Sequence, residues 1–106
     1  MNILTVGGSD PSSGAGIQSD IRTFSDFDAY AFTAITAITS QNTKQVSNIE
    51  PVSKKSLKSQ LDSVLSDFHI DGIKIGMVYN SDIIKVIHSE FRNNHVPLIV
   101  DPIIKS

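Results

Sequence analysis

Four short segments of this 106-residue chain carry residue types that suit the binding of a small molecule. They are the Gly- and Ser-rich stretch GGSDPSSGAG at residues 7–16, Gln-Asn-Thr at residues 41–43, Gly-Met at residues 76–77, and Asp101. Each segment follows an apolar run that the hydrophobic pattern predicts to be a β-strand. Ligands of open parallel sheets lie beyond the carboxyl ends of the strands, so the four segments are expected to meet at one rim. The sequence therefore predicts a small-molecule site at that rim.

The stretch at residues 7–16 predicts a loop that lets a ligand approach the backbone closely. Glycines such as Gly8 permit that approach, and free N–H groups at the start of a following helix bind anions. The loop lacks the Gly-Lys-Ser/Thr ending of a Walker motif, and Ser19 stands where a dinucleotide-binding fingerprint needs a third Gly or Ala. The alternative interpretation is an ordinary loop in which Ser12 or Ser13 caps the helix.

Several side chains near the rim offer different chemistry. Gln41 has an amide that donates and accepts side by side, which suits the edge of an aminopyrimidine or a similar heterocycle. Asp101, at a strand end and followed by proline, is suited to hold a cation or a polarised water. Asp20 lies one turn into the first expected helix, where the helix dipole favours a carboxylate, so a structural role is its simpler interpretation. Met77 is more readily explained as a core residue than as cover for a ligand.

Composition and charge exclude several other classes of protein and site. The net charge is −2 with no basic block, which gives no indication of a nucleic-acid partner, and the absence of cysteine excludes disulfides and thiolate chemistry. The longest apolar runs fall short of the about 20 residues of a membrane span, and the N-terminus lacks a signal pattern. The histidines lack partners at the usual ligand spacing and are predicted to be surface residues: His69, His88 and His95.

The elements that must position these residues predict an α/β fold with a mostly parallel sheet flanked by helices. Apolar runs predict strands at residues 2–8, 30–39, 72–76 and 96–100, and a short edge element at residues 46–52. A helix is the main alternative for residues 30–39, because three alanines weaken the strand signal. Three helices are predicted from apolar spacing, with inward faces formed by Ile17, Ile21 and Phe24, by Leu57, Leu61, Val64, Leu65 and Phe68, and by Ile83, Ile84, Ile87 and Phe91.

Two further expectations concern helix starts and the end of the chain. Ser53 is predicted to cap the second helix, and Ser81 or Asp82 the third. Ile103 and Ile104 follow the last expected strand with no crossover helix, and so few helices leave a face or edge of a parallel sheet open. We therefore expect a partial domain, the alternative being a frayed tail. A complete chain would be expected to self-associate through its last strand.

Four longer segments occur in a specific order: GGSDPSSGAGIQSDIRTF, AITAITSQNT, QLDSVLSDFHIDGIKIGMV and VPLIVDPII. In this order they resemble the N-terminal part of hydroxymethylpyrimidine/phosphomethylpyrimidine kinases, the thiamine-pathway members of the ribokinase-like superfamily. The similarity runs from Ile3 to about Ile104. Vitamin B6 kinases of the same superfamily match the first motif less well. The resemblance implies that residues 1–106 are the N-terminal, substrate-binding part of a ribokinase-like kinase domain, without its C-terminal ATP-binding and catalytic part.

The resemblance also implies an activity and a set of site residues. The implied reaction is the ATP-dependent, Mg²⁺-assisted phosphorylation of 4-amino-5-hydroxymethyl-2-methylpyrimidine, and then of its monophosphate, in the cytoplasm. Gln41 would bind the pyrimidine, and Asp101 would face the phosphate and metal region. The full set of implied substrate-binding residues is Gln41, Met77, Ala15, Asp20 and Gly8.

No catalytic residue of the family is expected in this chain. The family's Gly-Thr-Gly-Asp or Gly-Thr-Gly-Cys loop, which supplies the anion hole and the base, does not occur in these 106 residues. Because phosphoryl transfer depends on such groups, we predict that the chain alone binds the pyrimidine weakly at best and transfers no phosphate. The expected partners are the pyrimidine and either a second copy of the chain or the missing C-terminal half. The alternatives are a non-catalytic module that binds the pyrimidine or pairs with a partner chain, and half of a vitamin B6 kinase.

Overall fold

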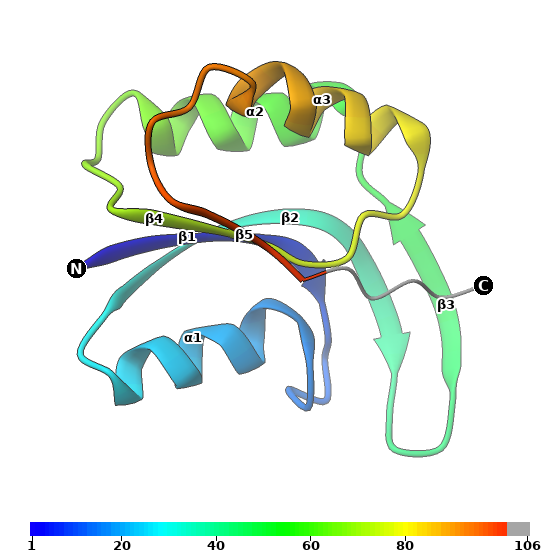
Figure 1. Ribbon diagram of the computed structural model, residues 1–106. Coiled ribbons are helices and arrows are strands. Elements are labelled where there is room, and N and C mark those ends of the chain that lie inside the picture. The colour runs from blue at the N-terminus through cyan, green and yellow to red at the C-terminus, as the bar shows by residue number, and fades with distance from the viewer. Residues whose placement is uncertain (102–106) are drawn as a thin grey trace.

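Eight helices and strands follow one another along residues 1–101, the part of the chain that the computed structural model describes (Figure 1). They are β1 (Asn2–Ser9), α1 (Gly16–Asp26), β2 (Tyr30–Gln41), β3 (Val46–Pro51), α2 (Lys54–Leu65), β4 (Gly72–Ile75), α3 (Ser81–Phe91) and β5 (Leu98–Val100). This order confirms the predicted α/β class and the strand at residues 30–39. The apolar pair Ile103 and Ile104 lies outside the described residues.

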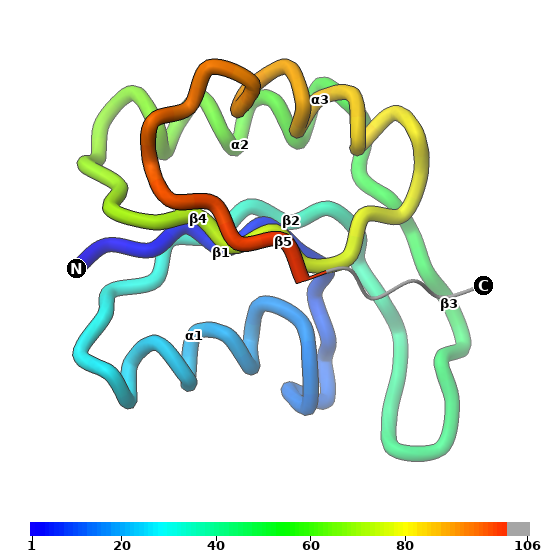
Figure 2. Tube along the Cα trace, viewed as in Figure 1, coloured from blue at the N-terminus to red at the C-terminus, as the bar shows by residue number. Residues whose placement is uncertain are grey.

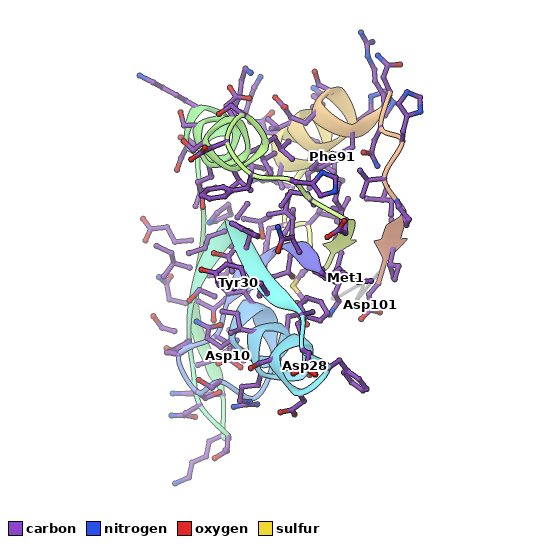
Figure 3. The ribbon with its side chains drawn as sticks, turned by 90° about the vertical axis from the view of Figure 1, so that its left-hand side faces the viewer. Met1, Asp10, Asp28, Tyr30, Phe91 and Asp101 are labelled. Atoms are coloured by element: carbon purple, nitrogen blue, oxygen red, sulfur yellow. The ribbon has the colours of Figure 1, made fainter. Side chains whose placement is uncertain are left out.

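The five strands form one sheet in the order β3-β2-β1-β4-β5. β1 pairs in parallel with β2 and with β4, β4 pairs in parallel with β5, and only β3 runs antiparallel, at the edge beside β2. In Figures 1 and 2, α1 lies on one face of the sheet and α2 and α3 lie on the other. Figure 3 shows the same layers from the side. The parallel strands therefore end at one edge of the sheet, as the sequence predicts.

The core lies between the sheet and the α2–α3 layer. Its buried members are Leu4, Val6, Ala34, Leu57, Leu61, Ile70, Ile73, Ile75, Ile83, Ile87 and Phe91. Burial of such side chains stabilises the fold by about 25 cal/mol for each Å² of apolar surface removed from water. On the opposite face, Ile17 is the one buried residue of α1. The two faces of the sheet are thus covered very unequally within residues 1–101.

Three residues predicted to face inward are largely exposed. Ile21 on α1 is 41% exposed, because α1 is the one helix on its face within residues 1–101 and its flank stays open. Ile84 on α3 is 51% exposed and lines an apolar groove beside β5. Phe68 lies beyond the end of α2, and its ring packs on Phe32 with centroids 4.6 Å apart. The spacing of apolar residues identified the amphipathic helices, but it did not predict which of their apolar side chains other elements cover.

The N-cap of α3 differs from the prediction by one residue. Asn80, rather than Ser81 or Asp82, adopts the extended cap conformation, and its side-chain oxygen accepts a hydrogen bond from the Ile83 N–H at 3.0 Å. Asn, Ser and Asp have similar cap preferences, so three such residues in a row leave the choice to the backbone. Asp82 instead occupies the first turn, where the helix dipole favours its charge.

The predicted N-cap of α2 is confirmed, since the Ser53 hydroxyl oxygen accepts from the Ser56 N–H at 3.0 Å. Ser53→Ala is expected to lower the free energy of unfolding by about 1 kcal/mol, because that N–H loses its partner. Ser59→Ala, at an exposed position inside the same helix, is the matched control and is expected to change it by less than about 0.5 kcal/mol. Urea denaturation measures both, and equal losses would contradict the prediction.

Within residues 1–101, no helix combines the length and the apolar character needed to cross a membrane.

Candidate functional site

A cavity of about 220 Å³ opens where the parallel strands end. Its wall comes from the end of β1 and the loop after it, the first half of α1, the end of β2, β4 with the segment after it, and the residue after β5: Gly7, Gly8, Ser9, Asp10, Ala15, Gly16, Asp20, Thr39, Gln41, Lys74, Gly76, Met77, Tyr79 and Asp101. The predicted meeting of four chain segments at one rim is therefore confirmed. All six residues singled out by the sequence line this cavity, namely Gly8, Ala15, Asp20, Gln41, Met77 and Asp101. Their individual roles stay predictions.

Asp10 holds together the loop between β1 and α1. Only 3% of Asp10 is exposed, and its carboxylate accepts from the Ser12 N–H at 2.8 Å, the Ser12 hydroxyl at 2.7 Å and the Ala15 N–H at 2.9 Å. Its own N–H donates to the Gln18 side-chain oxygen at 2.8 Å. The hydrogen bonds from Ser12, with smaller help from neighbouring N–H groups, lower the pKa of Asp10 although burial opposes them. Sequence reasoning missed Asp10, although Asp-x-Ser spacing is typical of an Asx-turn.

The start of α1 differs from the predicted serine cap. Ala15 is the N-cap and makes no side-chain bond, so neither Ser12 nor Ser13 caps the helix. The hydroxyl of Ser12 is directed to the loop carboxylate instead, and Ser13 adopts a left-handed φ of 63°. Gly16, the first helical residue, has φ 66°, and a Cβ there would stand 2.5 Å from the Gly8 carbonyl oxygen. The helix therefore starts against the strand with its first-turn N–H groups uncapped by any side chain.

Asp20 is paired inside the protein. One carboxylate oxygen accepts from the Thr5 hydroxyl at 2.7 Å, and the other contacts the Lys74 ammonium at 2.5 Å. Lys74 reaches this face because strand side chains alternate, so that its neighbours Ile73 and Ile75 point into the core. Any contact between Asp20 and a ligand competes with these two bonds. Lys74, which the sequence did not identify, brings a positive charge to the cavity wall.

Gln41 ends β2 beside a chain of hydrogen bonds. Its side-chain nitrogen donates to the Thr39 hydroxyl oxygen at 2.8 Å, and that hydroxyl donates to the Ser9 carbonyl oxygen at 2.7 Å. These contacts join the end of β2 to the end of β1. The predicted pyrimidine-binding amide is therefore held in place by a residue, Thr39, that the sequence did not identify.

Met77 and Tyr79 form the wall after β4. The carbonyl oxygen of Met77 accepts from the Thr36 hydroxyl at 3.0 Å, which fixes the backbone of this segment to β2. The Tyr79 hydroxyl lies over Gly8 so closely that a Cβ at Gly8 would collide with it. Burial raises the pKa of Tyr79, and the charge of Asp10 raises it further. The phenol is accordingly neutral at physiological pH and adds an uncharged hydroxyl to the cavity.

The carboxylates at the cavity offer little to a metal ion. Asp10 and Asp20 are committed to protein donors, and Asp101, whose N–H donates to the Ile75 carbonyl at 2.9 Å, is the exposed one of the three. Nowhere in residues 1–101 do three or more His, Asp or Glu side chains gather as metal ligands would. Residues 1–101 therefore contain no complete set of protein ligands for the Mg²⁺ that the resemblance implies.

The three histidines lie on the surface, as predicted: His69, His88 and His95 are all exposed. His69 contacts the Asp71 carboxylate at 3.0 Å, and Asp71 also accepts from the Asn2 N–H at 2.7 Å. None of the three lines the cavity.

Comparison with known proteins identifies the relatives of this chain. A sequence model of the family described as phosphomethylpyrimidine kinase matches residues 10–106. The hydroxymethylpyrimidine/phosphomethylpyrimidine kinase of Salmonella typhimurium is 43% identical over 100 residues, which make up 94% of this chain and 38% of that protein. The protein of the same name from Bacillus subtilis is 42% identical over 103 residues, or 94% of this chain and 37% of that protein.

Solved structures of kinases also resemble this chain. The phosphomethylpyrimidine kinase of Clostridium difficile superposes with a TM-score of 0.93 at 44% identity, over 100% of this chain and 46% of that one. The pyridoxal kinase of Staphylococcus aureus in complex with AMP-PCP superposes with a TM-score of 0.86 at 34% identity, over 99% of this chain and 39% of that one. These neighbours confirm the ribokinase-like fold, and this chain spans less than half the length of each relative. By the family match over residues 10–106, the chain belongs to the phosphomethylpyrimidine kinase family.

Proposed function

We propose that this chain is the N-terminal, pyrimidine-binding part of a hydroxymethylpyrimidine/phosphomethylpyrimidine kinase. The reaction would be phosphorylation of 4-amino-5-hydroxymethyl-2-methylpyrimidine, and then of its monophosphate, with ATP in the cytoplasm. The observation that carries the proposal is the cavity that Gln41 shares with Ala15 and Met77. Its volume of about 220 Å³ is enough for one small ring.

Different residues of the cavity contact different parts of the substrate. The Gln41 amide pairs with the polar edge of the ring, while the Ala15 methyl and the Met77 thioether contact its apolar surface. The uncapped start of α1 favours the negative charge that a phosphate brings, whereas the charge of Lys74 is balanced by Asp20. Asp101 lies at the far strand end and is assigned to the phosphate side. All these groups bind and orient the substrate, and none is assigned as the catalytic base.

ATP would be held by parts that the relatives carry beyond the region matched here. This part of the proposal is supported by a structural neighbour, the Staphylococcus aureus pyridoxal kinase, which was solved in complex with AMP-PCP. Because positioning and charge stabilisation of the phosphoryl group need those parts, the 106-residue chain on its own is expected to bind the pyrimidine without turning over ATP. The site would be completed by a C-terminal half or a second copy.

Calorimetric or NMR titration of the 106-residue chain tests the proposal. We expect saturable binding of 4-amino-5-hydroxymethyl-2-methylpyrimidine, weakened at least tenfold, or about 1.4 kcal/mol, by Gln41→Ala because the amide pairs with the ring edge. Gln45→Ala, in the exposed turn after β2, is the matched control and should leave affinity unchanged. Absence of binding at millimolar pyrimidine, or equal losses in both variants, would contradict the proposal. Tighter binding of pyridoxal would favour the vitamin B6 alternative, which the Staphylococcus aureus neighbour keeps open.

A further inference from the structure

We propose that Thr39 is a positioning residue that fixes the orientation of the Gln41 amide and thereby makes the cavity select a 4-aminopyrimidine over its 4-oxo counterpart. The inference rests on the proposed function, since it specifies how the substrate of that same site is recognised. It starts from two hydrogen bonds that meet at one oxygen, the Thr39 hydroxyl.

The Thr39 hydroxyl has a single proton, and that proton is committed. At 2.7 Å from the Ser9 carbonyl oxygen, the hydroxyl can only donate, because a carbonyl has no proton to give. Thr39 is 5% exposed, so water does not easily replace this partner. Towards any other group, the hydroxyl oxygen is left as an acceptor.

The committed proton determines which end of the Gln41 amide faces Thr39. At 2.8 Å from the hydroxyl oxygen, the amide must present its nitrogen, because its carbonyl oxygen would meet a second acceptor. A reversed amide would either leave two oxygens in contact or draw the Thr39 proton away from the Ser9 carbonyl oxygen, which would then lose this hydrogen bond. Either outcome costs about 1–3 kcal/mol.

The fixed amide presents a fixed pattern to the cavity. One N–H of Gln41 is used by Thr39, which leaves the other N–H as a donor and the carbonyl oxygen as an acceptor. A 4-aminopyrimidine offers the complementary pair, with a ring nitrogen that accepts and an amino group that donates. A 4-oxopyrimidine carries a ring N–H and a carbonyl in the same two places, so it would need the reversed amide. Thr39 therefore enforces discrimination between the two rings through the orientation that it gives to the Gln41 amide.

The test compares the dissociation constants of two ligands in three proteins. The ligands are 4-amino-5-hydroxymethyl-2-methylpyrimidine and its 4-oxo analogue, and the proteins are the 106-residue chain, Thr39→Val and Thr39→Ser. We expect the unaltered chain to prefer the amino compound at least tenfold. Thr39→Val, which keeps the shape but frees the amide, is expected to bring the ratio to within about threefold of unity, since the reversed amide then costs little. Thr39→Ser keeps the hydroxyl and should preserve the preference.

The outcomes separate this inference from the proposed function. If the amino compound binds but Thr39→Val weakens both ligands equally, the role of Thr39 is merely structural and the inference is overturned while the proposed function stands. If the unaltered chain binds both rings equally well, the inference is overturned. This outcome needs no variant, so the inference can be tested even if Thr39→Val folds poorly. If neither pyrimidine binds, both proposals are overturned.

Discussion

Gly16→Ala is expected to destabilise the folded chain by about 2–3 kcal/mol, because two penalties act at the same atom. The backbone of Gly16 has φ 66°, a left-handed conformation that costs a residue with a Cβ about 1–2 kcal/mol. The new Cβ would also stand 2.5 Å from the carbonyl oxygen of Gly8, which belongs to β1 and cannot rotate away. Relief requires the start of α1 to move off the strand, and with it the wall of the cavity.

A second glycine of the same loop supplies the control for this prediction. A Cβ at Gly14 would come no closer than 3.7 Å to the Ser12 hydroxyl, which is ordinary contact. Gly14→Ala is therefore expected to be neutral or to stabilise by about 0.4–1 kcal/mol, since alanine restricts the unfolded chain more than glycine does. Urea denaturation of both variants measures the difference in their free energies of unfolding, and similar midpoints would contradict the prediction.

Asp10→Asn is expected to lower the free energy of unfolding by about 2–4 kcal/mol and to weaken pyrimidine binding. The carboxylate accepts from Ser12 on one oxygen and from Ala15 on the other, so an amide must turn its NH₂ group towards one of these donors. That donor loses its partner and faces an amide hydrogen instead, and the bonds that remain lose their charge assistance. Asp26→Asn, an exposed carboxylate on α1 that changes the net charge equally, should alter stability by less than about 0.5 kcal/mol.

The pH dependence of the Asp10→Asn effect gives an independent readout. Hydrogen bonds hold the pKa of Asp10 below its ordinary value of 3.8, so the carboxylate contributes its full stabilisation above that pH. The contribution is lost as the pH falls below 3.8 and through the lowered pKa of the folded state. The stability difference between the unaltered chain and Asp10→Asn should therefore stay constant from neutral pH down to about 5 and shrink below 3.8. A difference that persists unchanged at low pH would assign the effect to packing.

The spacing of apolar residues located every helix and strand of the described fold, but it did not always determine whether a segment is a helix or a strand, or where a helix begins. For residues 30–39 the three alanines left a helix as an alternative, and Ala34 and Ala37 are in fact fully buried in a strand that has a neighbouring strand on each side. Small side chains suit a central strand under a helix layer, which is a property of the assembled sheet and not of the segment. The exact cap of α3 was unpredictable for a similar reason, because adjacent residues have equal intrinsic preference.

The candidate site was predictable where residues follow strand ends and unpredictable where they act through distant partners. Gln41 could be expected at the cavity from its place after a strand. Thr39 and Lys74 could not, because their importance comes from contacts with Ser9 and Asp20, which lie 30 and 54 positions away along the chain. The Thr39–Ser9 contact depends on the register of β2 against β1, and the Lys74–Asp20 contact depends on how α1 packs on the sheet. A single sequence specifies neither.

The buried cluster of the α2–α3 layer is drawn entirely from residues between Leu4 and Phe91. A chain leaving the ribosome would therefore contain every residue of this buried cluster before β5 had been synthesised. Early burial of these side chains would shorten the time for which their apolar surface is exposed to chaperones or to other nascent chains.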